Sequence, residues 1–328
     1  MDKIERRTFL KSAAAQVAFC GSMLAAPAVW AQGYPSKVIR FIVPLAPGGA
    51  IDFIARAVGE RLSQTLGWQI VVENRTGAGG TIGMDAAMKS DPDGYTILIT
   101  NDNAASAPHV MHLSHDYTKE LQPVCYLGRQ SQFLAVHSSL KLGSLSEFVA
   151  YVKANPGLGY ATSGVGTNQH VIGEWFAKEA GLKMDHVPFR GAGQAINDLI
   201  AAHVKAAWLG PTALVPHYEA GTIKLLAHSG SRRAPTLQQI PTLEESGFKG
   251  LVLDAWYAAF VPNGTSREIV ALLNSEMNKV LKNARLLDTF AKGAVEAVGG
   301  TPEDIGVLAR ADSEKYARLV KELNIGAN

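Results

Sequence analysis

Residues 38–62 read VIRFIVPLAPGGAIDFIARAVGERL, and this stretch decides the fold class. It opens with a continuous apolar run, which is typical of a strand buried on both faces. A loop with two prolines and two glycines follows, and then a segment with apolar residues at helical spacing. The stretch therefore predicts a buried strand, a bare loop and an amphipathic helix from Ala50 to Leu66 that ends at Gly67.

Strand and helix signals go on alternating to about Leu209, and two helices, 266–283 and 301–323, close the chain. Repeated strand–helix units indicate parallel sheets covered by helices, which is an α/β fold. The run LVLDAWYAAFVP, residues 251–262, is long and apolar enough to cross between two domains. No low-complexity linker occurs, so we expect a chain that passes back and forth between its domains through strands.

The bulk composition narrows the class of protein. The chain has 328 residues, of which 47% are hydrophobic and 18% are charged, as in a soluble globular protein with two domains. The formal net charge is +2, and all of this excess lies in the first 31 residues. The remaining chain is neutral and has no basic run, which argues against nucleic acid as a partner.

The N-terminus resembles an export signal. ERRTFLK, residues 5–11, pairs Arg6 with Arg7 as in a twin-arginine signal, with Glu5 where Ser or Thr is usual. A short apolar region rich in Gly and Ala follows, and AVWA precedes a predicted cut after Ala31. An uncleaved anchor helix is the alternative, which the shortness of the apolar region disfavours. Cleavage predicts a periplasmic protein in which Cys125 is the remaining cysteine, so that no internal disulfide can form.

Three loops lie where expected strands run into helices: residues 45–52, 101–107 and 163–170. In parallel sheets, ligands bind outside the carboxyl ends of strands, at the starts of the next helices. The loops consist largely of small and uncharged polar residues, so they offer main-chain N–H groups, which favour an anion together with the helix dipole. An ordinary tight turn is the alternative for any one loop. Three loops at equivalent positions favour a site for a carboxylate or phosphate.

Two side chains near these loops have two interpretations each. Asp52 either stabilises the first turn of its helix through the dipole or orients a water or a ligand amine. His170 either packs near the start of its helix or donates to a ligand.

Other patterns carry weaker signals. Gly77, Gly79 and Gly83 follow a strand as in a dinucleotide fingerprint, but their spacing departs from it by one residue. His109, His112 and His115 recur every third residue, which would turn the third away from the first two on a helix. No nucleophile with a neighbouring base stands out. We therefore predict no metal, no cofactor and no catalysis.

Taken together, the motifs resemble a known family, the substrate-binding receptors of tripartite tricarboxylate transporters, also called Bug receptors. The matching stretches occur in the family's order and cover the mature chain: PLAPGGAIDFIAR, VENRTGAGGTIG, DPDGYTILI, YATSGVGTNQHVIGEWF, VPFRGAGQAINDLIAAHV, QQIPTLEESGF, DAWYAAFVPNGTS and VGGTPEDI. The resemblance implies a two-domain periplasmic binding protein of type II-like fold, with mostly parallel sheets joined by crossing strands. It also implies that main-chain groups and waters, rather than ion pairs, hold a ligand carboxylate.

The loops and the family motifs together predict the ligand-binding residues. They are Leu45, Ala46, Pro47, Gly48, Gly49, Asp52, Asn101, Asn103, Ser163, Gly164, Gly166, Thr167, His170 and Gly191. The chain departs from the family at Leu45, where an aromatic residue is common, and at Ala50, which replaces a small hydroxyl residue or proline. Both changes touch the expected pocket wall and so affect which ligand is bound.

The resemblance implies a receptor that closes over a small organic carboxylate and delivers it to the large and small membrane subunits of a transporter. We expect a monomer with residues 34–130 and 253–328 in one domain and residues 131–252 in the other. A sensor subunit with the same fold, or a dinucleotide-dependent enzyme that uses the loop at Gly77, are the alternatives.

Overall fold

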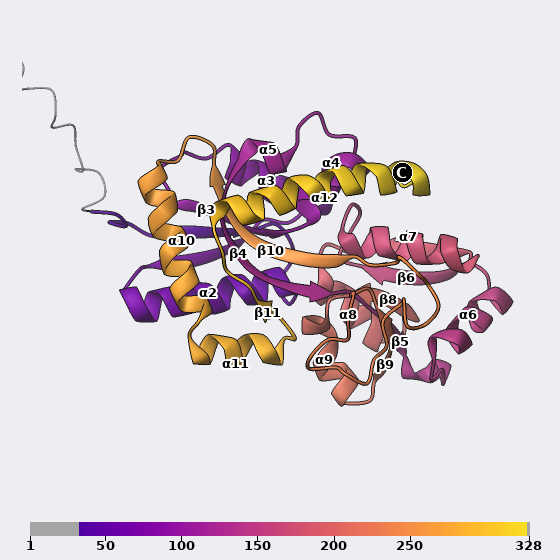
Figure 1. Cartoon of the computed structure of the whole chain (residues 1–328). Coiled ribbons are helices and arrows are strands. Elements are labelled where there is room, and N and C mark those ends of the chain that lie inside the picture. Colours follow the sequence, from indigo (N-terminus) through magenta and orange to yellow (C-terminus); the bar gives the residue numbers. More distant parts are fainter. Residues whose placement is uncertain (1–32, 327–328) are drawn as a thin grey trace, which may run out of the picture. The chain divides into compact units, whose positions relative to one another are not determined.

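The computed structural model describes residues 33–326. The predicted signal segment, residues 1–31, and the cut after Ala31 lie outside these residues. From Lys37 onward the chain forms one compact unit, which contains two β-sheets. We call each sheet with the helices that cover it a lobe (Figure 1).

The first lobe is built on six strands. In spatial order they are β11 (Glu296–Ala297), β4 (Leu121–Ser131), β10 (Asp254–Pro262), β3 (Thr96–Asn101), β1 (Ile39–Val43) and β2 (Ile70–Asn74). Strand β1 pairs in parallel with β2 and β3, whereas β10 runs antiparallel between β3 and β4. Strand β1 is buried except at Arg40, which is why its sequence is almost continuously apolar.

The second lobe is built on five strands. In spatial order they are β7 (Met184–Pro188), β6 (Leu158–Thr162), β8 (Ala206–Leu209), β5 (Phe133–His137) and β9 (Ile223–His228). Strand β6 is parallel to both neighbours, and β5 runs antiparallel between β8 and β9. The first sheet therefore has two strands, β10 and β11, that run against the other four, and the second sheet has one, β5.

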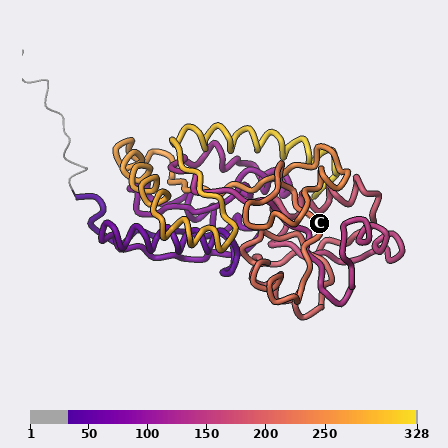
Figure 2. Tube along the Cα trace, turned by 60° about the horizontal axis from the view of Figure 1, so that its bottom comes forward, coloured from indigo at the N-terminus to yellow at the C-terminus, as the bar shows by residue number. Residues whose placement is uncertain are grey.

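Helices cover both faces of the first sheet. On one side lie α2 (Ala50–Leu66), α10 (Arg267–Leu281) and α11 (Ala284–Lys292), and on the other lie α3 (Thr81–Met88), α4 (Asn103–Val110), α5 (Tyr117–Glu120) and α12 (Pro302–Leu323). Figure 2 shows α2 and α12 on opposite sides of the strands. Short 3₁₀ turns, η1 (Ala78–Gly80) and η2 (Ser138–Leu140), precede α3 and α6.

The second sheet is covered in the same way. Helices α6 (Leu145–Ala154) and α7 (Asn168–Ala180) pack together through Phe148 and Phe176, and α8 (Ala192–Ile200) packs against α9 (Pro211–Glu219). The C-terminal helix α12 contacts α7 as well as the first lobe, and it extends over both in Figure 1. Its start is fixed by a capping box in which Thr301 and Asp304 bond to each other's main-chain N–H groups.

Two strands carry the chain between the lobes. Strand β4 of the first lobe leads into β5 of the second through Gln132 alone, and the chain returns through residues 229–253 into β10. The two crossings are bonded to each other, because Ser229 N–H donates to Gln132 O at 2.9 Å and Leu253 N–H donates to Ser229 O at 2.9 Å. Gln132 and Ser229 are almost fully buried, so the two crossings pass side by side through the interior between the lobes.

The predicted fold class is confirmed: two mostly parallel sheets, flanked by helices, are joined by crossing strands. The predicted domain boundaries, at residues 130/131 and 252/253, stay a prediction. Helix α2 has the predicted bounds, and Gly67 ends it in the left-handed conformation (φ 71°). Helices α9 and α11 were not predicted.

Candidate functional site

The loop after strand β1 leads directly into helix α2. Gly49 is the N-cap of this helix and is extended, with φ −96° and ψ 173°. A glycine N-cap has no side chain to accept from the first N–H groups of the helix. The first turn of α2 thus presents unsatisfied main-chain donors at the carboxyl end of the parallel strands, as the sequence predicts.

A cavity lies in front of this helix start and is bounded by both lobes. Its first-lobe wall consists of Leu45, Ala46, Gly49, Ala50, Ile51, Asp52, Asn101 and Tyr257, and its second-lobe wall of Ser163, Gln169, Ala192, Gly210 and Ala213. Among these lining residues none is a lysine, arginine or histidine. A negatively charged ligand would therefore meet main-chain donors and neutral polar groups here.

Three helices begin at this cavity. The N-caps are Gly49 for α2, Gly191 for α8 and Gly210 for α9, and none of these three has a side-chain cap. The helices are 17, 9 and 9 residues long, so each carries the positive end of a dipole toward the cavity. Three such helix starts favour an anion in the cavity although no cationic side chain lines it.

Asp52 is the one acidic residue in the wall, and its oxygens are already engaged. Arg56 Nη2 lies 2.9 Å from Oδ1, Asn74 Nδ2 donates to Oδ1 at 3.0 Å, and Gly48 N–H donates to Oδ2 at 3.4 Å. The ion pair with Asp52 raises the pKa of Arg56. Asn74 also donates to Leu45 O at 2.9 Å. These bonds favour a role of Asp52 in holding the loop in shape.

Neutral polar side chains make a bonded row along the cavity. Ser163 donates to Gln169 Oε1 through both its N–H and its hydroxyl, and Gln169 Nε2 donates to Gln132 Oε1 at 3.1 Å. Tyr257 OH donates to Gln130 Oε1 at 3.0 Å, and burial raises the pKa of this phenol, which stays protonated. The row links the cavity wall to Gln132 at the crossing point.

Eight of the residues predicted to bind ligand do not line the cavity: Pro47, Gly48, Asn103, Gly164, Gly166, Thr167, His170 and Gly191. Thr167 caps α7, where its hydroxyl accepts from His170 N–H at 3.3 Å. Asn103 donates to Gly79 O.

His170 belongs to a packed cluster in the second lobe. Its ring stacks on that of His186 with centroids 3.8 Å apart, and its Nδ1 accepts from Gly166 N–H at 3.3 Å. Burial lowers the pKa of His170 to about 4, so the ring is neutral at neutral pH. Its neighbour Gln169, which the sequence analysis did not single out, faces the cavity instead.

Tyr257, Gly210 and Ala213 also line the cavity, although the sequence patterns did not predict them. Tyr257 lies on β10, which is inserted between β3 and β4 by antiparallel pairing. Gly210 and Ala213 belong to the start of α9, a helix whose pattern is hidden by Pro211 and Pro216. A glycine before a proline at the end of a strand, as at Gly210–Pro211, is the signal that could have revealed this third helix start.

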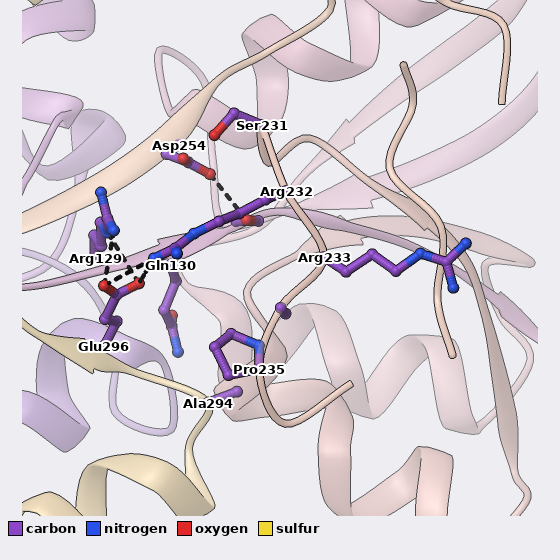
Figure 3. A pocket seen from close by; sticks show the side chains of 11 residues that line it. Arg129, Gln130, Ser231, Arg232, Arg233, Pro235, Asp254, Ala294 and Glu296 are labelled. Atoms are coloured by element: carbon purple, nitrogen blue, oxygen red, sulfur yellow. Dashed lines mark hydrogen bonds and ion pairs between the residues drawn. The ribbon is translucent and has the colours of Figure 1, made fainter. Parts of the chain in front are cut away.

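A second hollow, beside the crossing strands, has a different character (Figure 3). Arg129 and Arg232 both contact Glu296, at 2.7 and 3.2 Å, and the ion pair with Arg129 lowers the pKa of Glu296. Arg233 is paired with Glu245 at 3.0 Å, so each of the three arginines that line this hollow already has a carboxylate partner within the protein. We do not consider it the ligand site.

The chain is similar to proteins of a known family. The family model described as "Tripartite tricarboxylate transporter family receptor" matches residues 54–325. The chain belongs to this family. Its members are receptors, so the prediction that the chain is not an enzyme is confirmed. The predicted family is confirmed as well.

Similar proteins cover nearly the whole chain. Protein BugT of Bordetella pertussis is 34% identical over 306 residues, which are 91% of this chain and 93% of BugT. The structure of the periplasmic binding protein BugD has a TM-score of 0.86 at 27% identity and covers 90% of this chain and 100% of BugD. MatC from Rhodopseudomonas palustris, solved with bound malate, has a TM-score of 0.83 at 26% identity and covers 88% of this chain and 100% of MatC.

Proposed function

We propose that this receptor binds a small organic carboxylate in the cavity between its lobes and passes it to a membrane transporter of the tripartite tricarboxylate type. One observation carries the proposal: three uncapped helix starts, at Gly49, Gly191 and Gly210, meet at a cavity whose wall has no cationic side chain. Main-chain N–H groups at helix starts favour anions. Relatives solved with malate and with adipate support a carboxylate as that anion.

The rest of the wall suits the carbon skeleton of an organic acid. Leu45, Ile51, Ala192 and Ala213 provide apolar surface. Asn101, Ser163, Gln169 and Tyr257 provide neutral polar groups for hydroxyl or carbonyl substituents. A pocket with apolar walls and a few converging polar groups is typical of small-molecule sites.

Binding requires the lobes to move. The cavity has a volume of about 20 Å³, which is room for roughly one or two water molecules. An organic acid with several carbon atoms needs more, so the lobes must separate to admit it and then close on it. The crossing strands at Gln132 and Ser229 are the place for this hinge motion.

We also propose the cellular setting. The ERRTFLK motif supports export by the twin-arginine route, with cleavage near Ala31 and a monomeric receptor in the periplasm. The relatives named as periplasmic support the same compartment. Within residues 33–326 no helix is long and apolar enough to cross a membrane. The partners would be the large and small membrane subunits of the transporter.

A ligand screen on the mature protein, residues 32–328, tests the proposal. Thermal unfolding is followed with malate, adipate, citrate, benzoate and glutamate, each compared with the analogue in which amides replace the carboxylates. A carboxylate that binds should raise the free energy of unfolding by about 2.7 kcal/mol at a hundredfold excess over its Kd, and its amide should not. Equal shifts for acid and amide, or a shift with NAD alone, would refute carboxylate recognition.

A further inference from the structure

Two glycines predicted to bind ligand, Gly166 and Gly191, lie at the contact between the lobes, as do Gly79 and Gly193. The loop at residues 46–49 of the first lobe meets residues 190–193 of the second, main chain against main chain. Ala46 N–H donates to Arg190 O at 3.1 Å across this contact. A Cβ on Gly191 would lie 2.8 Å from Ala46 N and Cβ. A Cβ on Gly193 would overlap Pro47 O.

A second contact of the same kind lies on the other side of the loops. A Cβ on Gly79 would overlap Val165 O, and one on Gly166 would lie 3.2 Å from Ala107 Cα. Ser106 also donates to Gly166 O, and Asn168 Nδ2 donates to Asp102 Oδ2 at 2.6 Å. The main chains of the two lobes are thus in contact at two separate places, and each contact requires glycine, which has no side chain.

We propose that Gly191 and Gly193 are positioning residues for ligand capture, because they allow the second lobe to approach the Ala46–Gly49 loop closely enough to complete the cavity. This inference rests on the proposed function, since it describes how the same cavity closes. Gly193 itself does not line the cavity, so it acts only through this approach.

The conformation of Gly193 supports a role in contact rather than in backbone flexibility. It lies in the first turn of α8, where alanine is accepted and is a better helix former than glycine. Gly191 has φ 162°, an extended value that any residue can adopt. Neither position therefore requires glycine within its own lobe. The opposing main chain, which cannot move aside as a flexible side chain can, is what excludes a Cβ there.

Disulfide trapping measures this approach without any ligand. A Cβ built on Gly49 lies 3.3 Å from Ala192 Cβ, close to the separation that a disulfide needs. The pair Gly49→Cys with Ala192→Cys, placed in the mature protein, should oxidise readily whenever the lobes close. Cys125 is buried and does not compete. The rate of disulfide formation under mild oxidant then reports the closed population.

Adding Gly193→Ala should slow trapping roughly tenfold or more, because the new methyl group opposes closure. The unfolding temperature should stay the same or rise, which separates a closure defect from misfolding. Gly143→Ala is the matched control, since its Cβ would have only an ordinary contact with Glu147 at 3.7 Å, and trapping should stay within about twofold. Gly191→Ala is a second test should the first variant fold poorly.

An unchanged trapping rate in folded Gly193→Ala or Gly191→Ala protein would overturn the inference. That result would leave the proposed function intact if a carboxylate still stabilises the wild type. Conversely, slow trapping in both variants, with no carboxylate bound by the wild type, would support the closure contact and refute the proposed ligand class.

Discussion

The starts of helices α2 and α7 differ, although both follow a glycine-rich loop at the end of a parallel strand. Helix α2 begins after Gly49, has no side-chain cap and faces the cavity. Helix α7 begins after Thr167, whose hydroxyl accepts from His170 N–H, and the side chains that follow are bonded within the protein. The comparison teaches that glycine in such a loop does not by itself mark an anion site. What matters is whether the cap leaves the first N–H groups available.

The largest effect should come from blocking the uncapped start. Gly49→Val puts a branched side chain at an extended position, beside Ala192 and in front of the first turn of α2. Losing two hydrogen bonds to a charged acceptor costs roughly 1.5–3 kcal/mol each, so affinity should fall by about a few hundredfold or more. Calorimetric titration with the best carboxylate of the screen measures this. Unchanged affinity in a folded variant would show that the loop is only a turn.

The buried histidines at α7 should affect the stability of the protein at acidic pH rather than its affinity for ligand. Burial lowers the pKa of His170 to about 4 and that of His186 to about 3. The unfolded chain, with ordinary histidine pKa values near 6.5, therefore binds more protons below that pH, and stability is full above pH 6.5 and falls as the pH drops toward 4. For His170 alone the loss approaches about 3 kcal/mol.

Denaturant unfolding of the wild type and of His170→Gln at pH 7 and pH 4.5 isolates this contribution. Asp102 titrates in the opposite sense, because burial raises its pKa to about 7 and its contribution to stability falls as the pH rises from 4 to 7. Both proteins contain Asp102, so its effect cancels in the comparison. The wild type should lose more stability on acidification than the variant, and equal losses would contradict a buried neutral His170.

The cap itself gives a smaller effect. Thr167→Ala removes the side chain that satisfies the start of α7, so the free energy of unfolding should fall by about 1 kcal/mol. Affinity for the carboxylate should stay within about threefold, because Thr167 does not line the cavity. Thr167→Ser, which keeps the hydroxyl, serves as the control. A large loss of affinity in the alanine variant, with stability intact, would show that the start of α7 binds ligand as the start of α2 is proposed to do.

Local sequence patterns predicted the first segment of the first lobe, from strand β1 to helix α2, correctly. The bounds of α2 follow from helical spacing, a bare loop before it and Gly67 after it, and all three signals are local. Helix α9 was not predicted because it has only nine residues, of which two are prolines. Its absence from the prediction removed Gly210 and Ala213 from the expected site.

The remaining site residues depend on tertiary structure. Which of Asn168, Gln169 and His170 faces the cavity is set by the phase of α7, and the Thr167 cap fixes that phase only in the folded loop. Tyr257 reaches the cavity because β10 inserts between β3 and β4, a pairing of residues more than a hundred positions apart. Glycines at a lobe contact and glycines at a ligand have the same sequence pattern, so sequence alone cannot separate them.

The smallest expected effect concerns Asp52, and it refines the class of ligand at the uncapped start. Asp52→Asn keeps an oxygen acceptor but ends the ion pair with Arg56, whose side chain is 53% exposed. A pair with one half-exposed partner and a first-turn charge are each worth a few tenths to about 1 kcal/mol, so the loss of stability should be small. Asp52 also lines a cavity meant for an anion, so removing its charge should leave the affinity for a simple carboxylate unchanged or raise it slightly. If Asp52 instead receives a ligand amine, a ligand such as glutamate should bind more weakly to the variant, because its ammonium loses a carboxylate partner. Titrating malate and glutamate into both proteins separates the cases: weaker binding of malate would contradict the role of Asp52 as a residue that only holds the loop.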